Sequence, residues 1–123
     1  MIDRDVKTGV RIYRNSESGQ GFEDLGEFDE GLFWKLVAGL PLFEEKEVSI
    51  GLYRSKRDYL DVSRDQDSSY RLYSERMFPD QPWWKRLFSS HIICREDQRI
   101  DFLREAVSVY IHESRASFES RYA

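Results

Sequence analysis

Three segments in which apolar and polar side chains alternate constrain the fold of this chain most. They span residues 48–53, 59–63 and 70–75. Strict alternation places the apolar side chains on one face of a strand and the polar ones on the other. The polar turns between them, residues 54–58 and 64–68, are too short for the crossover that a parallel return needs. The pattern therefore predicts an antiparallel three-strand meander.

Further elements flank this meander. Residues 10–13 and 91–94 have the character of short strands, and residues 15–21 that of a loop. Helical spacing predicts one helix between Asp29, a good N-cap, and Gly39. The order β-α-β-β-β-β-α, with a last helix described below, predicts a single α+β domain over residues 1–123. Both helices would cover one face of a mainly antiparallel sheet of about five strands.

The last helix is expected over about residues 98–120, with Asp97 as its N-cap. Its apolar positions step along one face at intervals of three and four. We expect three of them to be largely buried: Leu103, Val107 and Tyr110. The same spacing puts Ser114 on the apolar face.

Cysteine and histidine offer little chemistry. A lone Cys in a β-run is usually a small buried hydrophobe, so Cys94 is expected to be structural. His91 lies three positions away, and on a strand such positions point to opposite faces. The pair is therefore not expected to act as a thiol with its base or as two zinc ligands. A single cysteine also excludes an intramolecular disulfide and suits a reducing compartment.

Phosphate-binding and nucleophile motifs are missing from the sequence. It contains no G-x-G-x-x-G, no P-loop and no G-x-S-x-G. No stretch approaches the roughly 20 apolar residues of a membrane span, and the charged start is unlike a signal peptide. We expect a cytoplasmic protein without a cofactor, a metal or a membrane partner.

The net charge of −4 is unevenly distributed. Six acidic residues and no Lys or Arg lie between Glu17 and Glu30. Such a block repels phosphate, which makes a nucleic-acid partner unlikely on that side. Two interpretations stay open: a solvated loop kept soluble by its charge, or a patch that steers a basic protein partner. In the second, the binding residues would be Glu23, Asp24 and Glu27.

Tyrosine and charged side chains share the sheet face turned away from the predicted helices. They are Tyr53, Tyr59, Asp61, Arg71, Tyr73 and Glu75, to which Tyr13 and Arg11 of the first strand would add. Tyrosines are good strand formers that make cross-strand pairs, and Tyr with Arg is also enriched at protein interfaces. Asp61 and Glu75 are neighbouring carboxylates, but Arg71 beside them favours a salt-bridge cluster over a catalytic pair.

Trp83 and Trp84 are adjacent, so both cannot point inward from an ordered element. We expect one to fill the core and the other, taken as Trp84, to lie on a binding surface. The following Lys85 and Arg86 allow stacking on single-stranded nucleic acid. Two basic residues beside an acidic chain support that role only thinly.

Three stretches together resemble small bacterial immunity proteins of polymorphic-toxin and contact-dependent inhibition systems. They are residues 28–34 (FDEGLFW), the meander with residues 50–53 (IGLY) and 59–62 (YLDV), and residues 114–122 (SRASFESRY). The resemblance implies an acidic, non-catalytic protein that blocks a toxin domain by binding it.

Three classes of function are therefore compared. The first is a non-enzymatic protein-binding module, most concretely an inhibitor of a basic toxin domain. The alternative is a small ligand-binding protein or enzyme with a pocket between the sheet and the helices, built on Asp61, Arg71, Tyr73 and Glu75. The third is a self-associating structural protein that uses the same tyrosines.

Overall fold

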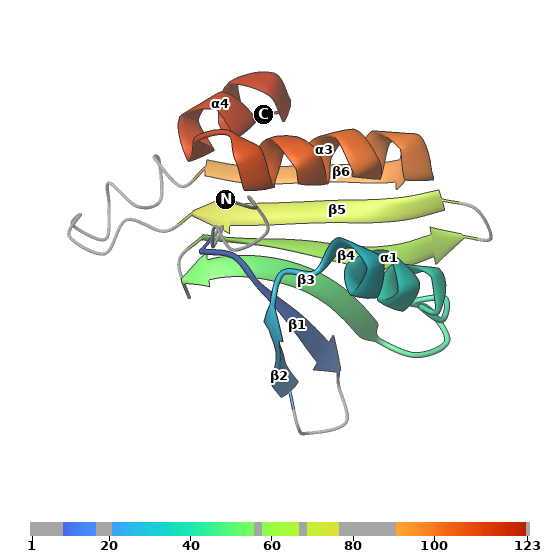
Figure 1. Cartoon of the computed structure of the whole chain (residues 1–123). Coiled ribbons are helices and arrows are strands. Elements are labelled where there is room, and N and C mark those ends of the chain that lie inside the picture. The colour runs from blue at the N-terminus through green and yellow to red at the C-terminus, as the bar shows by residue number, and fades with distance from the viewer. Residues whose placement is uncertain (1–8, 17–20, 56–57, 67–68, 77–90, 123) are drawn as a thin grey trace, which may run out of the picture.

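Over the residues that the structure describes, a six-stranded antiparallel sheet carries three helices on one face (Figure 1). The computed structural model describes residues 9–16, 21–55, 58–66, 69–76 and 91–122. The strands are β1 (Arg11–Ser16), β2 (Gly21–Glu27), β3 (Val48–Ser55), β4 (Asp58–Gln66), β5 (Ser69–Arg76) and β6 (His91–Gln98). The helices are α1 (Glu30–Ala38), α3 (Ile100–His112) and α4 (Arg115–Tyr122). The α+β class is confirmed, with one strand and one helix more than expected.

The strand order is β2-β1-β3-β4-β5-β6. The meander predicted from alternation is β3-β4-β5, and each of these strands pairs with the next. Strands β2 and β3 both run antiparallel to β1 and therefore parallel to each other. A parallel return needs a crossover, and α1 supplies it. In Figure 1, α1 packs against β3, α3 against β5 and α4 against β6.

The extra strand, β2, comes from the acidic block that could also be interpreted as a solvated loop. It pairs with β1 along its whole length. Two ion pairs join the strands, Arg11 Nε to Asp24 at 2.8 Å and Arg14 Nη2 to Glu23 at 2.6 Å. Gly26 has a φ of 109° beside a register shift in this pair, a backbone angle that glycine adopts at little cost. Pairing with the arginines of β1 thus lets an acidic segment form a strand.

Helix α1 begins and ends where the sequence predicts. The Asp29 side chain accepts a hydrogen bond from the Leu32 N–H at 2.9 Å, so one free amide of the first turn is satisfied. Phe28 and Phe33 pack with their ring centroids 6.0 Å apart, as in a hydrophobic staple. Gly39 is the C-cap. Local chemistry alone therefore defines this helix.

The long C-terminal helix was wrongly predicted as one piece. Strand β6 continues to Gln98, Asp97 has a φ of 57°, and α3 starts after Arg99 without a side-chain cap. The helix stops at Glu113, whose backbone is extended. Ser114 is exposed and accepts a hydrogen bond from the Ser117 N–H at 3.1 Å, so it begins a new helix instead of facing the core.

None of the helices in the described part of the chain is both long enough and apolar enough to pass through a membrane.

The core lies between the helices and the apolar face of the sheet, which we call the covered face. Its strand side chains are Ile12, Ile50, Leu52, Leu60, Val62, Leu72 and Ile93. Leu103, Val107 and Tyr110 are buried among them, as predicted. Cys94 is exposed, so its expected burial is wrong. It pairs with Tyr73 in the register of the edge strand β6 and therefore belongs to the opposite face.

Helix α4 is held to the sheet by one buried guanidinium. Arg115 donates to the Ser74 hydroxyl at 2.6 Å and to Asp58 Oδ1 at 3.3 Å. It also pairs with Glu119 one turn further along α4 at 2.8 Å. The Tyr110 hydroxyl donates to the same Asp58 oxygen at 2.9 Å. The charged groups at this end of the core are thus paired with one another, as buried charges must be.

Candidate functional site

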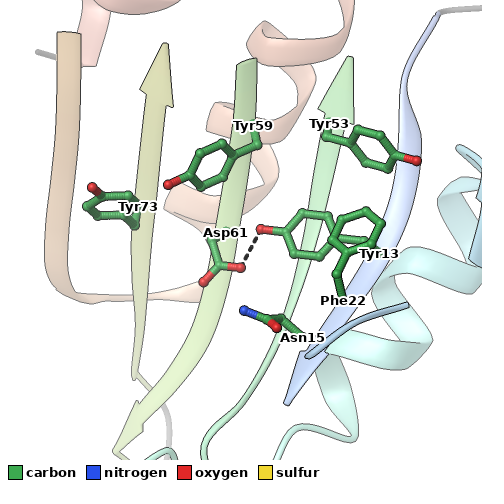
Figure 2. A pocket seen from close by; sticks show the side chains of 7 residues that line it. All are labelled: Tyr13, Asn15, Phe22, Tyr53, Tyr59, Asp61 and Tyr73. Carbon is green, nitrogen blue, oxygen red and sulfur yellow. Dashed lines mark hydrogen bonds between the residues drawn. The ribbon is translucent and has the colours of Figure 1, made fainter. Parts of the chain in front are cut away.

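The face opposite the helices carries a pocket of about 690 Å³. We call it the aromatic pocket. Its lining consists of Tyr13, Asn15, Phe22, Tyr53, Tyr59, Asp61 and Tyr73. Figure 2 shows the Asp61 carboxylate between Tyr13 on one side and Tyr59 and Tyr73 on the other, with the helices behind the sheet. The volume falls in the range of about 300–1,000 Å³ that ligand sites commonly have.

The sheet register brings three of the pocket residues, Tyr13, Asp61 and Tyr73, into one row. Tyr13 of β1 pairs with Gly51 of β3, Gly51 with Asp61 of β4, Asp61 with Tyr73 of β5, and Tyr73 with Cys94 of β6. Side chains directly opposite each other in a sheet point to the same face. Residues separated by up to 81 positions therefore share one row across five strands.

Gly51 leaves the space that the Tyr13 side chain needs to reach Asp61. A Cβ at this position would lie 2.4 Å from the Tyr13 ring and 2.3 Å from the Leu60 carbonyl oxygen. Without a side chain there, the Tyr13 ring lies across β3 and its hydroxyl donates to Asp61 Oδ1 at 2.5 Å. Only glycine allows this close approach. Tyr13 is buried even though it faces away from the helices.

Phe22 of β2 forms the outer wall beside Tyr13. Its ring stacks on the Tyr13 ring with centroids 5.1 Å apart, and it meets the Tyr53 ring edge-on at 5.2 Å. Phe22 is nevertheless 55% exposed. Sequence reasoning missed Phe22 and its lining neighbour Asn15 because both lie in a segment expected to be a loop. The available signal was an aromatic residue flanked by the glycines and acids of the block.

Tyr59 and Tyr73 form the opposite wall, and their ring centroids are 6.1 Å apart. The Tyr59 hydroxyl donates to Glu75 at 2.9 Å, and the Tyr73 hydroxyl reaches the same oxygen at 3.5 Å. Glu75 is thereby engaged by tyrosines and does not line the pocket. The carboxylates of Asp61 and Glu75 have separate partners, so the structure does not join them into a pair.

Arg71, expected in a salt-bridge cluster with these carboxylates, takes other contacts. Its guanidinium lies 5.0 Å from the centroid of the Phe43 ring, and its Nε donates to the Ser63 hydroxyl at 3.4 Å. Within the described residues it forms no ion pair with Asp61. Its charge still acts on Asp61 through space.

Among the described residues that line the pocket, Asp61 is the only acidic or basic one. Tyr13 and the Ser49 hydroxyl, at 2.9 Å, both donate to Oδ1. Burial raises the pKa of Asp61, while these two hydrogen bonds and the charge of Arg71 act in the opposite direction. Burial also raises the pKa of the Tyr13, Tyr59 and Tyr73 hydroxyls. Near neutral pH the tyrosines are therefore uncharged, and Asp61 is the carboxyl group among the described residues of the lining.

The acidic residues nominated from sequence lie on β2. Asp24 accepts hydrogen bonds from Arg11 and from the Tyr53 hydroxyl, which hold the pKa of Asp24 well below its usual range. Glu23 pairs with Arg14, and Glu27 lies opposite Arg11 in the register. Since arginines accompany these acids, the block is a paired strand edge and not an isolated negative patch. Trp84 lies outside the described residues.

A second depression lies where α1 meets β1, β2 and β3. It has a volume of about 740 Å³, and its lining includes Arg14, Glu23, Lys35 and Lys46. This is where the alternative function expected a pocket, between sheet and helices. The four residues expected to build that pocket do not line it. Asp61 and Tyr73 line the aromatic pocket on the other face instead.

Over the described ranges, no three or more His, Cys, Asp or Glu side chains are grouped so that they could hold a metal ion.

The chain was compared with family models, with curated proteins and with solved structures, and none of the three comparisons gave a match.

Proposed function

We propose that this protein is a non-enzymatic binding module that docks a protein partner on the face carrying the aromatic pocket. One observation carries the proposal: five aromatic rings surround a pocket at the centre of the face opposite the helices. Tyrosine and other aromatic residues are enriched in the buried centres of protein interfaces. A tyrosine adds a large contact area at a low cost in conformational entropy.

The rings are held in place before any partner arrives. Tyr13 and Tyr59 are fixed by hydrogen bonds to Asp61 and Glu75, and Tyr53 by one to Asp24. Side chains that are already ordered lose less freedom on binding. These contacts support a surface built for docking more than a set of unrelated strand residues.

The partner we propose is a basic toxin domain, as the resemblance to immunity proteins implies. The acidic residues of β2 border Phe22 and would face the positive surface of such a partner. Charges outside the buried contact act mainly on the association rate. Because Asp24 and Glu23 already pair with arginines, their contribution to steering should be smaller than that of unpaired acids.

The test uses the product of the adjacent gene, if it is a basic protein, as the candidate partner. The variant Tyr53→Ala/Tyr59→Ala/Tyr73→Ala should weaken the complex by about 2 kcal/mol or more, mainly through faster dissociation. The variant Glu23→Lys/Asp24→Lys/Glu27→Lys should slow association and flatten its salt dependence. Because it also removes the ion pairs to Arg11 and Arg14, amide chemical shifts must first show that β2 stays paired with β1. Surface plasmon resonance separates the two rates.

A control variant on the helix side is Arg104→Ala/Glu105→Ala, which changes two exposed residues of α3. It should bind like the wild type, and circular dichroism should show all variants folded. Wild-type rates for both test variants would contradict the proposal.

A ligand-binding protein is the second candidate, favoured by the volume of the aromatic pocket. A thermal-shift screen of small metabolites tests it, since a ligand at 100 times its dissociation constant adds roughly 2.7 kcal/mol of stability. A hit that is lost in the tyrosine variant, without any protein partner, would favour this candidate.

A further inference from the structure

We propose that the aromatic pocket binds an organic cation, namely the guanidinium or ammonium group of an Arg or Lys side chain supplied by the protein partner. The inference rests on the proposed function for the source of the cation. The class of ligand follows from the pocket itself.

Asp58 and Asp61, two carboxylates on β4, differ in their ion-pair partners. Asp58 points to the covered face and lies 3.3 Å from Arg115 and 3.5 Å from Arg54. Asp61, three residues later, points to the opposite face and has no such ion pair within the described residues. Asp58 thus has two guanidinium partners that tie it into the core. Asp61 lacks such partners among the described residues.

The two oxygens of Asp61 have different surroundings. Tyr13 and Ser49 both donate to Oδ1. Oδ2 accepts no hydrogen bond from the described part of the chain, and Figure 2 shows the carboxylate exposed to the pocket between the two aromatic walls. Asp61 is half-buried, and a carboxylate partly removed from water is stabilised by a partner that supplies both an opposite charge and a hydrogen bond. A positively charged donor at Oδ2 would supply both the opposite charge and the missing hydrogen bond.

Aromatic rings form the walls of the pocket on both sides of Asp61. Tyr59 and Tyr73 lie on one side of Asp61, and Tyr13, Phe22 and Tyr53 on the other. The faces of aromatic rings attract cations, and cages of such rings bind ammonium groups in many proteins. A neutral ligand would leave Asp61 unpaired, and an anion would be repelled by it. The same fold already stacks guanidinium groups on rings, with Arg71 on Phe43 and Arg54 on Tyr110.

The experiment titrates the ¹⁵N-labelled protein with N-acetyl-arginine methylamide and N-acetyl-lysine methylamide. The citrulline and Nε-acetyl-lysine derivatives are the matched neutral probes. The cations should give saturable shifts at the amides of Gly51, Asp61 and Tyr73, with a dissociation constant on the order of millimolar. The neutral probes should bind at least about tenfold more weakly, because they cannot pair with the carboxylate.

Asp61→Asn should weaken the binding of both cations to the pocket at least about tenfold. The matched control Asp101→Asn removes the same charge from an exposed position on α3 and should bind like the wild type. Circular dichroism checks the folding of each variant. Tyr73→Leu keeps the carboxylate, removes one aromatic wall, and gives an independent test should Asp61→Asn fail to fold.

Equal binding of cationic and neutral probes, or unchanged cation binding by Asp61→Asn or Tyr73→Leu, would overturn the inference. Tighter binding of free choline than of either side-chain analogue would overturn the assignment to a partner side chain. Competition separates this inference from the proposed function. If a partner docks on this face but the cations do not compete with it, the cation site fails and the function stands. If the cations bind but no partner perturbs these amides, the function fails.

Discussion

The two faces of the sheet are built from the same strands and have opposite characters. On the covered face, Leu52, Leu60 and Leu72 stack under the helices and are fully buried. One residue away along the same strands, Tyr53, Asp61 and Tyr73 line the aromatic pocket. Side chains of a strand alternate between the two faces, so each strand contributes to the core and to the candidate site at once.

Asp58 on the covered face and Asp61 on the opposite face are satisfied by different kinds of partner. The covered face closes its charges internally, with Asp58, Arg115 and Glu119 in one network. The opposite face leaves Asp61 with hydroxyl donors only. A closed network stabilises a fold, and a carboxylate without a cation is available for a ligand. Substitutions on the two faces should therefore differ in their effect on stability, most strongly at buried apolar positions and least at exposed ones.

The sharpest test of the two faces uses adjacent isoleucines of β6. Ile93 is 2% exposed on the covered face, and Ile92 is 47% exposed on the other. Ile93→Ala should lower the free energy of unfolding by about 2–5 kcal/mol, through lost burial and a cavity. Ile92→Ala should change it by less than about 0.5 kcal/mol. Urea unfolding of both variants checks this, and similar losses would mean that the strand phase is wrong.

Gly51 tests whether the pocket depends on one close approach. In Gly51→Ala the new Cβ would meet the Leu60 carbonyl oxygen, a backbone atom that cannot move aside, and the Tyr13 ring. We expect a loss of about 1–3 kcal/mol in the free energy of unfolding, as for other overpacked sites. Loss of the Tyr13–Asp61 contact should accompany it.

The control for this prediction is Gly31→Ala. The nearest atom to a Cβ at Gly31 is an Asp29 side-chain oxygen at 3.5 Å, an ordinary contact. That variant should keep or slightly raise the stability, because alanine favours the helix. Equal effects of the two substitutions would show that Gly51 is not a steric requirement.

Asp58 and Asp61 of β4 should respond to substitution in opposite directions. Asp58→Asn should lower the free energy of unfolding by about 1–3 kcal/mol, because Arg115 and Tyr110 lose a charged partner. Asp61→Asn should raise it near neutral pH by a smaller amount. The amide oxygen can still accept from Tyr13 and Ser49, and the cost of burying an unpaired charge disappears.

The pH dependence gives the sign of the Asp61 effect. Burial raises the pKa of Asp61 above its ordinary value of 3.8, so the folded state binds this proton more tightly than the unfolded state. The stability that this tighter proton binding adds to the folded state is therefore lost as pH rises through the folded-state pKa of Asp61. The gain from Asp61→Asn should be larger near neutral pH than below about pH 4. Urea titrations at both values measure it, and a gain that falls with rising pH would contradict the assignment.

The smallest effect is expected at Cys94. Its thiol is exposed, in register with Tyr73. Cys94→Ser should change the free energy of unfolding by less than about 0.5 kcal/mol. A thiol reagent should label the folded protein completely, without denaturant. Labelling only after unfolding would mean that the thiol is covered.

The sequence by itself determined the α+β class, the β3-β4-β5 meander and the ends of α1. These depend on alternation, turn length and capping, which act between residues close in the chain. It also placed Tyr53, Tyr59, Asp61 and Tyr73 on one face, because strand periodicity decides that without knowledge of the partner strands.

Only the tertiary structure decided that the acidic block is a strand, since β2 depends on pairing with the arginines of β1. The break at Glu113 likewise became visible only with α4 anchored by Arg115. The aromatic pocket depends above all on the strand register, which sets Tyr13 opposite Gly51 and Gly51 opposite Asp61. Register joins residues far apart in sequence, and local patterns do not carry it.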